Sequence, residues 1–139
     1  IRETFGRMAM NDYETAALVA GGHTFGKSHG AASESYKGPD PEASKLQDQS
    51  TGWNSGYKSG KGVDTISSGI EGAWTQNPTK WDMGYLDCLY GHDWELTKSP
   101  AGAHQWTPKK NGQKIKMVPD AHQKGVLHPP MMQTTDIYQ

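Results

Sequence analysis

Residues 20–29 (AGGHTFGKSH) place one histidine, His23, in a stretch of unusually free backbone. Gly21, Gly22 and Gly26 carry no Cβ atom, so the backbone here can lie close against a flat group. An imidazole presented in this way can ligate an iron at the centre of a flat macrocycle. The pattern therefore predicts a haem-binding turn in which His23 is the iron ligand and Gly22 lies beside the cofactor.

A haem-ligating histidine needs two further groups. One accepts the proton on its other ring nitrogen, and the other fixes the rotation of the ring. We expect the acceptor to be Asp136, at the end of the run MMQTTD. A carboxylate partner gives the imidazole imidazolate character, which favours cleavage of the peroxide O–O bond over carriage of dioxygen. We expect Trp74 to pack beside the imidazole and to donate its indole N–H to the same carboxylate, since a buried indole normally finds an acceptor.

The same residues also suit plainer roles. A single histidine after a helix is more often a cap or a core residue than a metal ligand. His23 and His29 could be imagined as zinc ligands, but their spacing in a glycine-rich turn without a thiolate matches no compact zinc pattern. The 5 tryptophans and 6 tyrosines could form a sugar-stacking surface, although in a domain with so few aliphatic residues aromatic side chains are more often the core.

The bulk properties are those of a single domain with a modest core. Only 33% of the 139 residues are hydrophobic, and 17 glycines and 8 prolines raise the loop content. A formal net charge of −1 without basic or acidic blocks implies neither a nucleic-acid partner nor an anionic membrane. The single cysteine, Cys88, excludes an internal disulfide and four-thiolate metal cages, and we expect a semi-buried free thiol.

The two ends of the sequence are unusual. Residues 1–12 (IRETFGRMAMND) are charged where a signal peptide would be apolar, and no apolar run reaches the length of a membrane span, so we expect a soluble chain. The sequence opens on Ile1 in what reads as the middle of a helix and stops at Gln139 soon after a structured turn. We therefore expect a piece of a longer protein.

Two helices are expected at the start of the chain. Residues 2–10 carry apolar side chains on one side, which predicts a short helix. A second helix begins after Asn11, because Asn11 and Glu14 have the spacing of a capping box. Two consecutive glycines should then end this helix just before His23.

The rest of the chain alternates irregular and regular segments. Residues 27–62 are rich in Gly, Ser, Pro, Lys and Asp, which predicts a long loop. Residues 81–91 (WDMGYLDCLYG) have apolar side chains at helical spacing and form the best amphipathic helix. Residues 94–97 and 104–106 flank the turn sequence SPAG, which favours a small hairpin. The expected fold class is mainly α with long irregular loops and a small β-hairpin.

Several long strings resemble one family. NDYETAALVAGGHTFGKSHG is similar to the proximal-histidine signature of the catalase-peroxidases, bifunctional enzymes of the plant, fungal and bacterial haem peroxidase superfamily. The resemblance continues in the same order through SSGIEGAWTQNPTKWD, YLDCLYGHDWELTKSPAGAHQW, MVPDAH and PPMMQTTD. These strings cover most of the chain. Only the loop at residues 31–60 and the connector around Asn111 match loosely.

The resemblance implies a fold, a cofactor and an activity. Residues 1–139 would form the proximal-side portion of a haem peroxidase domain, an incomplete piece of the haem-peroxidase helical fold that lies in the N-terminal half of the parent. The cofactor would be haem b, one per haem domain, with His23 as proximal iron ligand, Trp74 as proximal tryptophan and Asp136 as the aspartate that links them. The parent would break down hydrogen peroxide under oxidative stress and oxidise small organic donors, as a cytoplasmic homo-oligomer.

Further residues receive roles from the same resemblance. Met8 resembles the methionine that is cross-linked to a tyrosine and a distal tryptophan in an adduct required for catalase activity. Ser68 resembles the serine near a haem propionate at the substrate channel. Lys27, Ser28 and His29 resemble residues beside the propionates, and cationic and hydroxyl donors suit carboxylates. Without a cofactor, Met8 would be a plain core methionine, and Lys27, Ser28 and His29 would belong to a solvated turn.

The sequence also departs from the family pattern. The distal arginine, tryptophan and histidine that activate peroxide lie upstream in the family and are absent from this sequence, as is the tyrosine partner of Met8. Without their acid–base assistance we expect this chain alone not to be a competent catalase. His104 stands where the family has tryptophan, and Asp136 lacks the leucine-rich segment that follows it there. The alternative function is a non-enzymatic module without haem that binds a carbohydrate or protein partner or serves a structural role.

Overall fold

The computed structural model describes residues 1–30, 32–48, 54–61, 64–66 and 69–138. Its elements are α1 (Arg2–Arg7), α2 (Asp12–Thr24), the 3-10 helices η1 (Glu34–Tyr36), η2 (Pro41–Ala43) and η3 (Leu46–Asp48), α3 (Gly84–Tyr90), β1 (Trp94–Lys98), β2 (His104–Pro108), β3 (Val118–Pro119), β4 (Leu127–His128) and α4 (Thr134–Ile137). The described chain is partly helical and carries two small antiparallel sheets. The expectation of a mainly α chain is therefore met only in part.

Helix α2 begins where the sequence predicts and ends later. Asn11 Oδ1 accepts from Glu14 N at 2.9 Å, and Glu14 Oε2 accepts from Asn11 N at 3.0 Å, which confirms the capping box. The predicted end before His23 is wrong, because the helix continues to Thr24. Consecutive glycines permit a helix end but do not force one. The left-handed residue that redirects the chain is Gly26, with φ of 98°.

Helix α3 is shorter than the amphipathic pattern predicts. Asp82 Oδ1 accepts from Gly84 N at 2.8 Å, and the helix starts only at Gly84. Trp81 therefore precedes the helix and is 72% exposed, although the pattern placed it on the buried face. Tyr85 and Cys88 do lie on the buried face. The Cys88 thiol is fully buried rather than semi-buried, and this burial raises its pKa.

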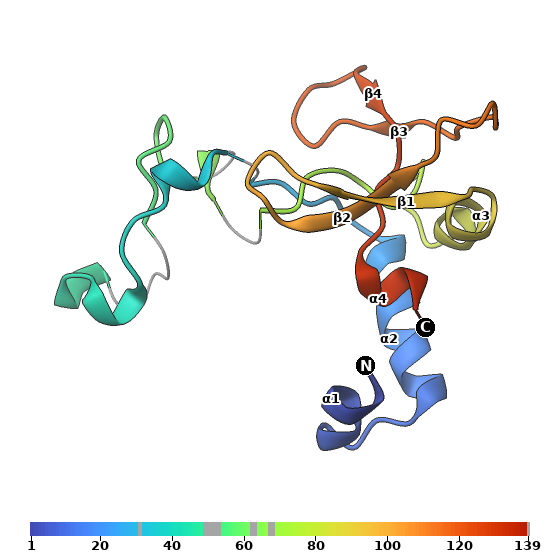
Figure 1. The fold of residues 1–139 in the computed structure, drawn as a ribbon, viewed down its shortest axis with the longest axis horizontal. Helices are drawn as coiled ribbons and strands as arrows, with labels where there is room; N and C mark the ends of the chain where they lie inside the picture. Colours follow the sequence, from blue (N-terminus) through green and yellow to red (C-terminus); the bar gives the residue numbers. More distant parts are fainter. Residues whose placement is uncertain (31, 49–53, 62–63, 67–68, 139) are drawn as a thin grey trace.

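The predicted hairpin is confirmed. Strands β1 and β2 pair antiparallel, with Leu96 opposite Trp106 at the middle of the ladder. Ser99 N donates to Ala103 O at 2.8 Å and closes the connection between the strands. Strands β3 and β4 form the second antiparallel pair. In Figure 1 the β1–β2 hairpin lies between β3–β4 above it and α4 and α2 below it.

Three extended contacts join distant segments, and the first of them involves strand β2 of the hairpin. Trp106 N donates to Met132 O at 2.7 Å and Met132 N donates back at 3.0 Å, so the chain before α4 is held against β2. Met131 N donates to Ala73 O at 3.0 Å, and a further bridge pairs Ser28 with Gly72. Met131 and Met132 belong to a buried hydrophobic cluster that also contains Trp74, Tyr85 and Cys88.

The long loop predicted for residues 27–62 is irregular where it is described, with η1, η2 and η3 as short turns. Figure 1 shows η1 to η3 extending away from the sheets. Gly38 N donates to Asn54 O at 2.7 Å, and Gly56 N donates to Tyr36 O at 2.8 Å, which ties the two limbs of this loop together. Within the described ranges, no helix combines the length and the apolar character that a membrane crossing requires.

Candidate functional site

The centre of the site is a histidine–aspartate pair. His23 Nδ1 lies 2.7 Å from Asp136 Oδ1, across 113 residues of sequence. A carboxylate only accepts hydrogen bonds, so Nδ1 carries the proton and Nε2 is the nitrogen left for a ligand. The Asp136 side chain is fully buried, whereas 20% of the His23 side chain is exposed. The predicted partnership of these two residues is thus present in the structure.

Asp136 is satisfied by three donors. Tyr85 Oη donates to Asp136 Oδ1 at 2.7 Å, and Gln133 N donates to Asp136 Oδ2 at 2.7 Å. His23 supplies the third donor. A buried carboxylate without such partners would cost several kcal/mol or change its protonation, so these donors make a buried charge at this position tolerable.

Trp74 lies flat against the imidazole. The ring centroids of His23 and Trp74 are 4.1 Å apart, with an interplanar angle of 10°. This stack limits rotation of the imidazole, as the sequence predicted. The predicted hydrogen bond from the indole to Asp136 is wrong, because Trp74 Nε1 is buried with no hydrogen-bond partner among the described residues. The hydroxyl of Tyr85 donates to the carboxylate in its place.

The four side chains come from four separate segments. His23 lies on the last turn of α2, and Tyr85 lies on α3, which contacts α2. Trp74 follows the segment held by the Ser28–Gly72 bridge. Asp136 lies in α4, which is anchored to β2 by the bond from Trp106 Nε1 to Thr134 Oγ1 at 3.2 Å. The site is therefore assembled by tertiary contacts rather than by any single element.

Sequence reasoning missed the role of Tyr85. The helical pattern placed Tyr85 on the apolar face of α3, but it did not indicate a hydrogen-bond partner for the hydroxyl. A tyrosine that is 1% exposed nearly always hydrogen-bonds, so its predicted burial was the available signal. The choice of Asp136 as partner could not be read from the spacing of the two residues.

Lys27, Ser28 and His29, which were predicted to lie beside the cofactor, contact neighbouring loops. Lys27 Nζ donates to Asp120 O at 2.9 Å, and Ser28 Oγ donates to Ile70 O at 3.2 Å. The rings of His29 and His122 meet edge to face with centroids 5.0 Å apart. These contacts fix the segment after α2 against residues 70–72 and 120–122.

Asp120 organises the loop that contains residues 120–122. Its Oδ2 accepts from His122 N and from Gln123 N, both at 2.7 Å, while Oδ1 lies 2.7 Å from His128 Nε2. The two backbone N–H groups, together with the His128 side chain, lower the pKa of Asp120 from 3.8 to about 2. Asp120 therefore stays ionised through the neutral and mildly acidic range, and it holds β3 and β4 close together.

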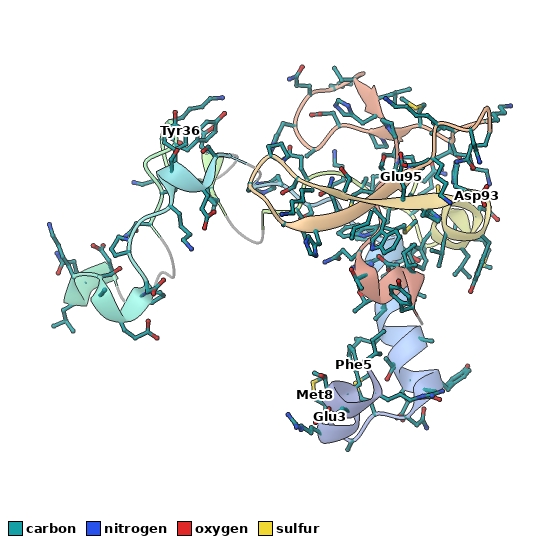
Figure 2. All side chains as sticks on the ribbon, in the orientation of Figure 1. Glu3, Phe5, Met8, Tyr36, Asp93 and Glu95 are labelled. Atoms are coloured by element: carbon teal, nitrogen blue, oxygen red, sulfur yellow. The ribbon has the colours of Figure 1, made fainter. Side chains whose placement is uncertain are left out.

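Of the two remaining predicted site residues, the structure describes only Met8. Met8 is the C-cap of α1 and is 54% exposed, and Figure 2 shows it beside Phe5 at the end of the molecule opposite the β1–β2 hairpin. The structure therefore does not bring Met8 next to His23. Ser68 lies outside the described residues, so its predicted place near the cofactor stays a prediction.

The donor set at His23 fits a haem iron. A ring nitrogen held by a carboxylate, with the second nitrogen left for a metal, is the usual arrangement of a metal-ligating histidine. Beyond their chain neighbours and the backbone of α2, Gly21, Gly22 and Gly26 have no atom of the described chain within 4 Å of a Cβ placed on them, so their surroundings are open. For zinc, by contrast, the described ranges contain no group of three or more His, Cys, Asp or Glu side chains placed to hold an ion.

Comparison with known proteins assigns the chain to a class. The family model described as peroxidase matches residues 1–128. The chain therefore belongs to the peroxidase family.

Within that class, the chain is similar to catalase-peroxidases, as the sequence strings predicted. It is 62% identical over 138 residues to the catalase-peroxidase of Gloeobacter violaceus, covering 99% of this chain and 19% of that protein. It is 63% identical over 137 residues to the catalase-peroxidase of Trichlorobacter lovleyi, covering 99% of this chain and 18% of that protein. For the catalase-peroxidase of Acaryochloris marina the identity is 59% over 137 residues, with 99% and 19% coverage. The chain spans about a fifth of the length of these curated relatives.

Proposed function

We propose that this chain supplies the iron-ligand side of a haem site in an enzyme of the catalase-peroxidase type. The parent enzyme would break down hydrogen peroxide and oxidise small organic donors. The observation that carries the proposal is the pairing of His23 Nδ1 with Asp136 Oδ1 at 2.7 Å under a parallel Trp74 ring. The names of the similar proteins point to the same chemistry.

The residues of this chain would bind the cofactor and orient its ligand. His23 would ligate the iron of haem b through Nε2, with Gly22 beside the macrocycle. Asp136 would hold the proton on Nδ1 and place negative charge behind the imidazole, which strengthens it as a donor. Trp74 would keep the imidazole from rotating. When bound, haem would supply the oxidation–reduction chemistry, and Trp74 would host oxidising equivalents beside it.

The remaining assignments are proposals from the family resemblance. Lys27, Ser28, His29 and Ser68 would lie near the haem carboxylates, and the position of the first three within six residues of His23 supports this. Met8 would join the covalent adduct only in the parent. Residues 1–139 would be the proximal portion of its haem domain, with one haem per domain in a cytoplasmic homo-oligomer.

Haem binding by the chain itself is the direct test. The chain is titrated with ferric haem, and we expect a Soret band typical of histidine ligation. The variant His23→Gly should lose that spectrum and recover it when free imidazole fills the space. The matched control is His104→Gly, at an exposed position on β2, which should bind haem as the parent chain does. The proposal would be contradicted if His23→Gly kept the unaltered spectrum, or if the unsubstituted chain took up no haem.

One observation favours a second candidate function, binding of a carbohydrate without haem. Phe25 and Trp81 stack with centroids 5.5 Å apart and an interplanar angle of 18°. They are 46% and 72% exposed, so they form an aromatic platform at the surface. Quenching of tryptophan fluorescence by glycans, combined with the absence of a Soret band, would favour this function over the haem site.

A further inference from the structure

Tyr85 makes a contact that the proposed function does not require. Its ring is buried at 1% exposure and meets the His23 ring edge to face, with centroids 6.1 Å apart. Its hydroxyl donates to Asp136 Oδ1 at 2.7 Å. His23 Nδ1 also lies 2.7 Å from this oxygen. Two donors therefore share one carboxylate oxygen while a third occupies the other.

Sharing one oxygen has an electrostatic consequence. A hydrogen bond to a carboxylate draws electron density from the oxygen that accepts it, and such charge-assisted bonds are among the strongest in proteins. Coupled hydrogen bonds change one another's strength when they meet at one atom in a low-dielectric interior. The bond from Tyr85 therefore weakens the one that the same oxygen accepts from His23.

The position of Trp74 gives independent support. Its indole N–H is buried without a partner in the described part of the chain, although the indole lies stacked on His23 next to this carboxylate. Leaving a buried donor unsatisfied is energetically unfavourable. The carboxylate of Asp136 thus accepts a hydrogen bond from Tyr85, whereas the nearby Trp74 indole has no acceptor in the described part of the chain.

We propose that Tyr85 is a positioning residue that sets the strength of the Asp136–His23 hydrogen bond by taking part of the acceptor capacity of Oδ1. Through this bond it limits the imidazolate character of His23 and hence the electron donation to the iron. This last step rests on the proposed haem function, whereas the effect on the hydrogen bond does not. The same hydroxyl links α3 to α4, so Tyr85 also fixes the orientation of Asp136.

The variant Tyr85→Phe isolates the hydroxyl. Phenylalanine fills the same ring space, and Asp136 Oδ1 keeps its bond from His23, so no new buried donor is left unsatisfied. The matched control is Tyr90→Phe, which removes the same atom from the same helix at a side chain that is 82% exposed. Thermal unfolding of both variants checks that the fold is kept.

The first measurement uses the full chain without haem. Proton NMR of the chain labelled with ¹⁵N-histidine reports the Nδ1 proton of His23. In Tyr85→Phe this proton should move downfield, as expected for a stronger hydrogen bond, and in Tyr90→Phe it should not move. An unchanged His23 proton in Tyr85→Phe overturns the proposal. A shift at the Trp74 indole proton with none at His23 also overturns it.

The second measurement uses the chain loaded with haem. Resonance Raman spectra of the ferrous form should show a higher iron–imidazole stretching frequency in Tyr85→Phe, and the reduction potential should become more negative. If both the stretching frequency and the reduction potential stay unchanged, the proposed effect of Tyr85 on the iron is contradicted. If the unsubstituted chain takes up no haem, the proposed function fails. The NMR result without haem then decides by itself whether Tyr85 acts on the hydrogen bond between His23 and Asp136.

Discussion

Replacing Asp136 by asparagine tests whether the buried carboxylate organises the site. The two side chains have nearly the same shape, so Asp136→Asn removes charge and acceptor capacity without opening a cavity. Three donors point at the carboxylate, from His23 and Tyr85 on one oxygen and from Gln133 on the other. An amide offers one oxygen and one NH₂ group, so with the protons placed as in the structure at least one of these donors faces another donor.

The magnitude follows from that mismatch. Loss of a hydrogen bond to a charged group costs roughly 1.5–3 kcal/mol, and a buried donor left unsatisfied costs about 1–3 kcal/mol more. We therefore expect Asp136→Asn to lower the free energy of unfolding by about 3 kcal/mol. That is a large part of the roughly 5–15 kcal/mol of a typical domain, and it corresponds to a Tm lowered by about 10 °C.

Urea unfolding followed by tryptophan fluorescence and by far-UV circular dichroism measures this change. The comparison is Asp87→Asn, which removes the same charge from an exposed position on α3. With an unchanged m-value, the midpoint of Asp136→Asn should fall well below that of Asp87→Asn. The reasoning would be refuted if the two variants unfolded within about 0.5 kcal/mol of each other, since the three donors would then contribute nothing that an exposed carboxylate does not.

Two further perturbations probe the local elements that carry the site. Asn11→Ala removes the acceptor of the α2 capping box and should lower the free energy of unfolding by about 1 kcal/mol, measured by urea unfolding; equal stability would show that the box contributes nothing. The pKa of Asp120 is lowered from 3.8 to about 2, so its ionised form stabilises the fold fully above pH 3.8 and this contribution is lost as pH falls through 2. The stability advantage over Asp120→Asn, roughly 1–3 kcal/mol near neutral pH, should therefore shrink between these values, and an advantage that does not depend on pH would argue against this assignment.

Local features of the fold were predictable because their interactions span few residues. The capping box joins Asn11 and Glu14 at a spacing of three, and the hairpin is encoded by strand-forming residues on both sides of SPAG. Predictions failed where a local signal competed with packing. Two consecutive glycines favour a helix end, yet α2 continues to Thr24, whose Oγ1 donates to Ala20 O at 2.6 Å. Trp81 matched the helical period, yet Met83 is the N-cap and the helix begins only at Gly84, whose N–H donates to Asp82 Oδ1.

The pairing of His23 with Asp136 and the stack of Trp74 were predictable, but the other donors to Asp136 were not. The order of amino acids indicated a histidine in a glycine-rich run, an aspartate and a tryptophan as candidate site residues, and the structure places these three side chains together. Which donors Asp136 accepts depends on tertiary packing. The contacts of α4 with β2 and of α3 with α2 bring the hydroxyl of Tyr85 to the carboxylate, while the indole of Trp74 stacks on His23 and has no hydrogen-bond partner in the described part of the chain. Distance along the chain is the cause, since Tyr85 and Asp136 are 51 residues apart and hydrogen-bond geometry between such segments depends on packing that no local pattern records.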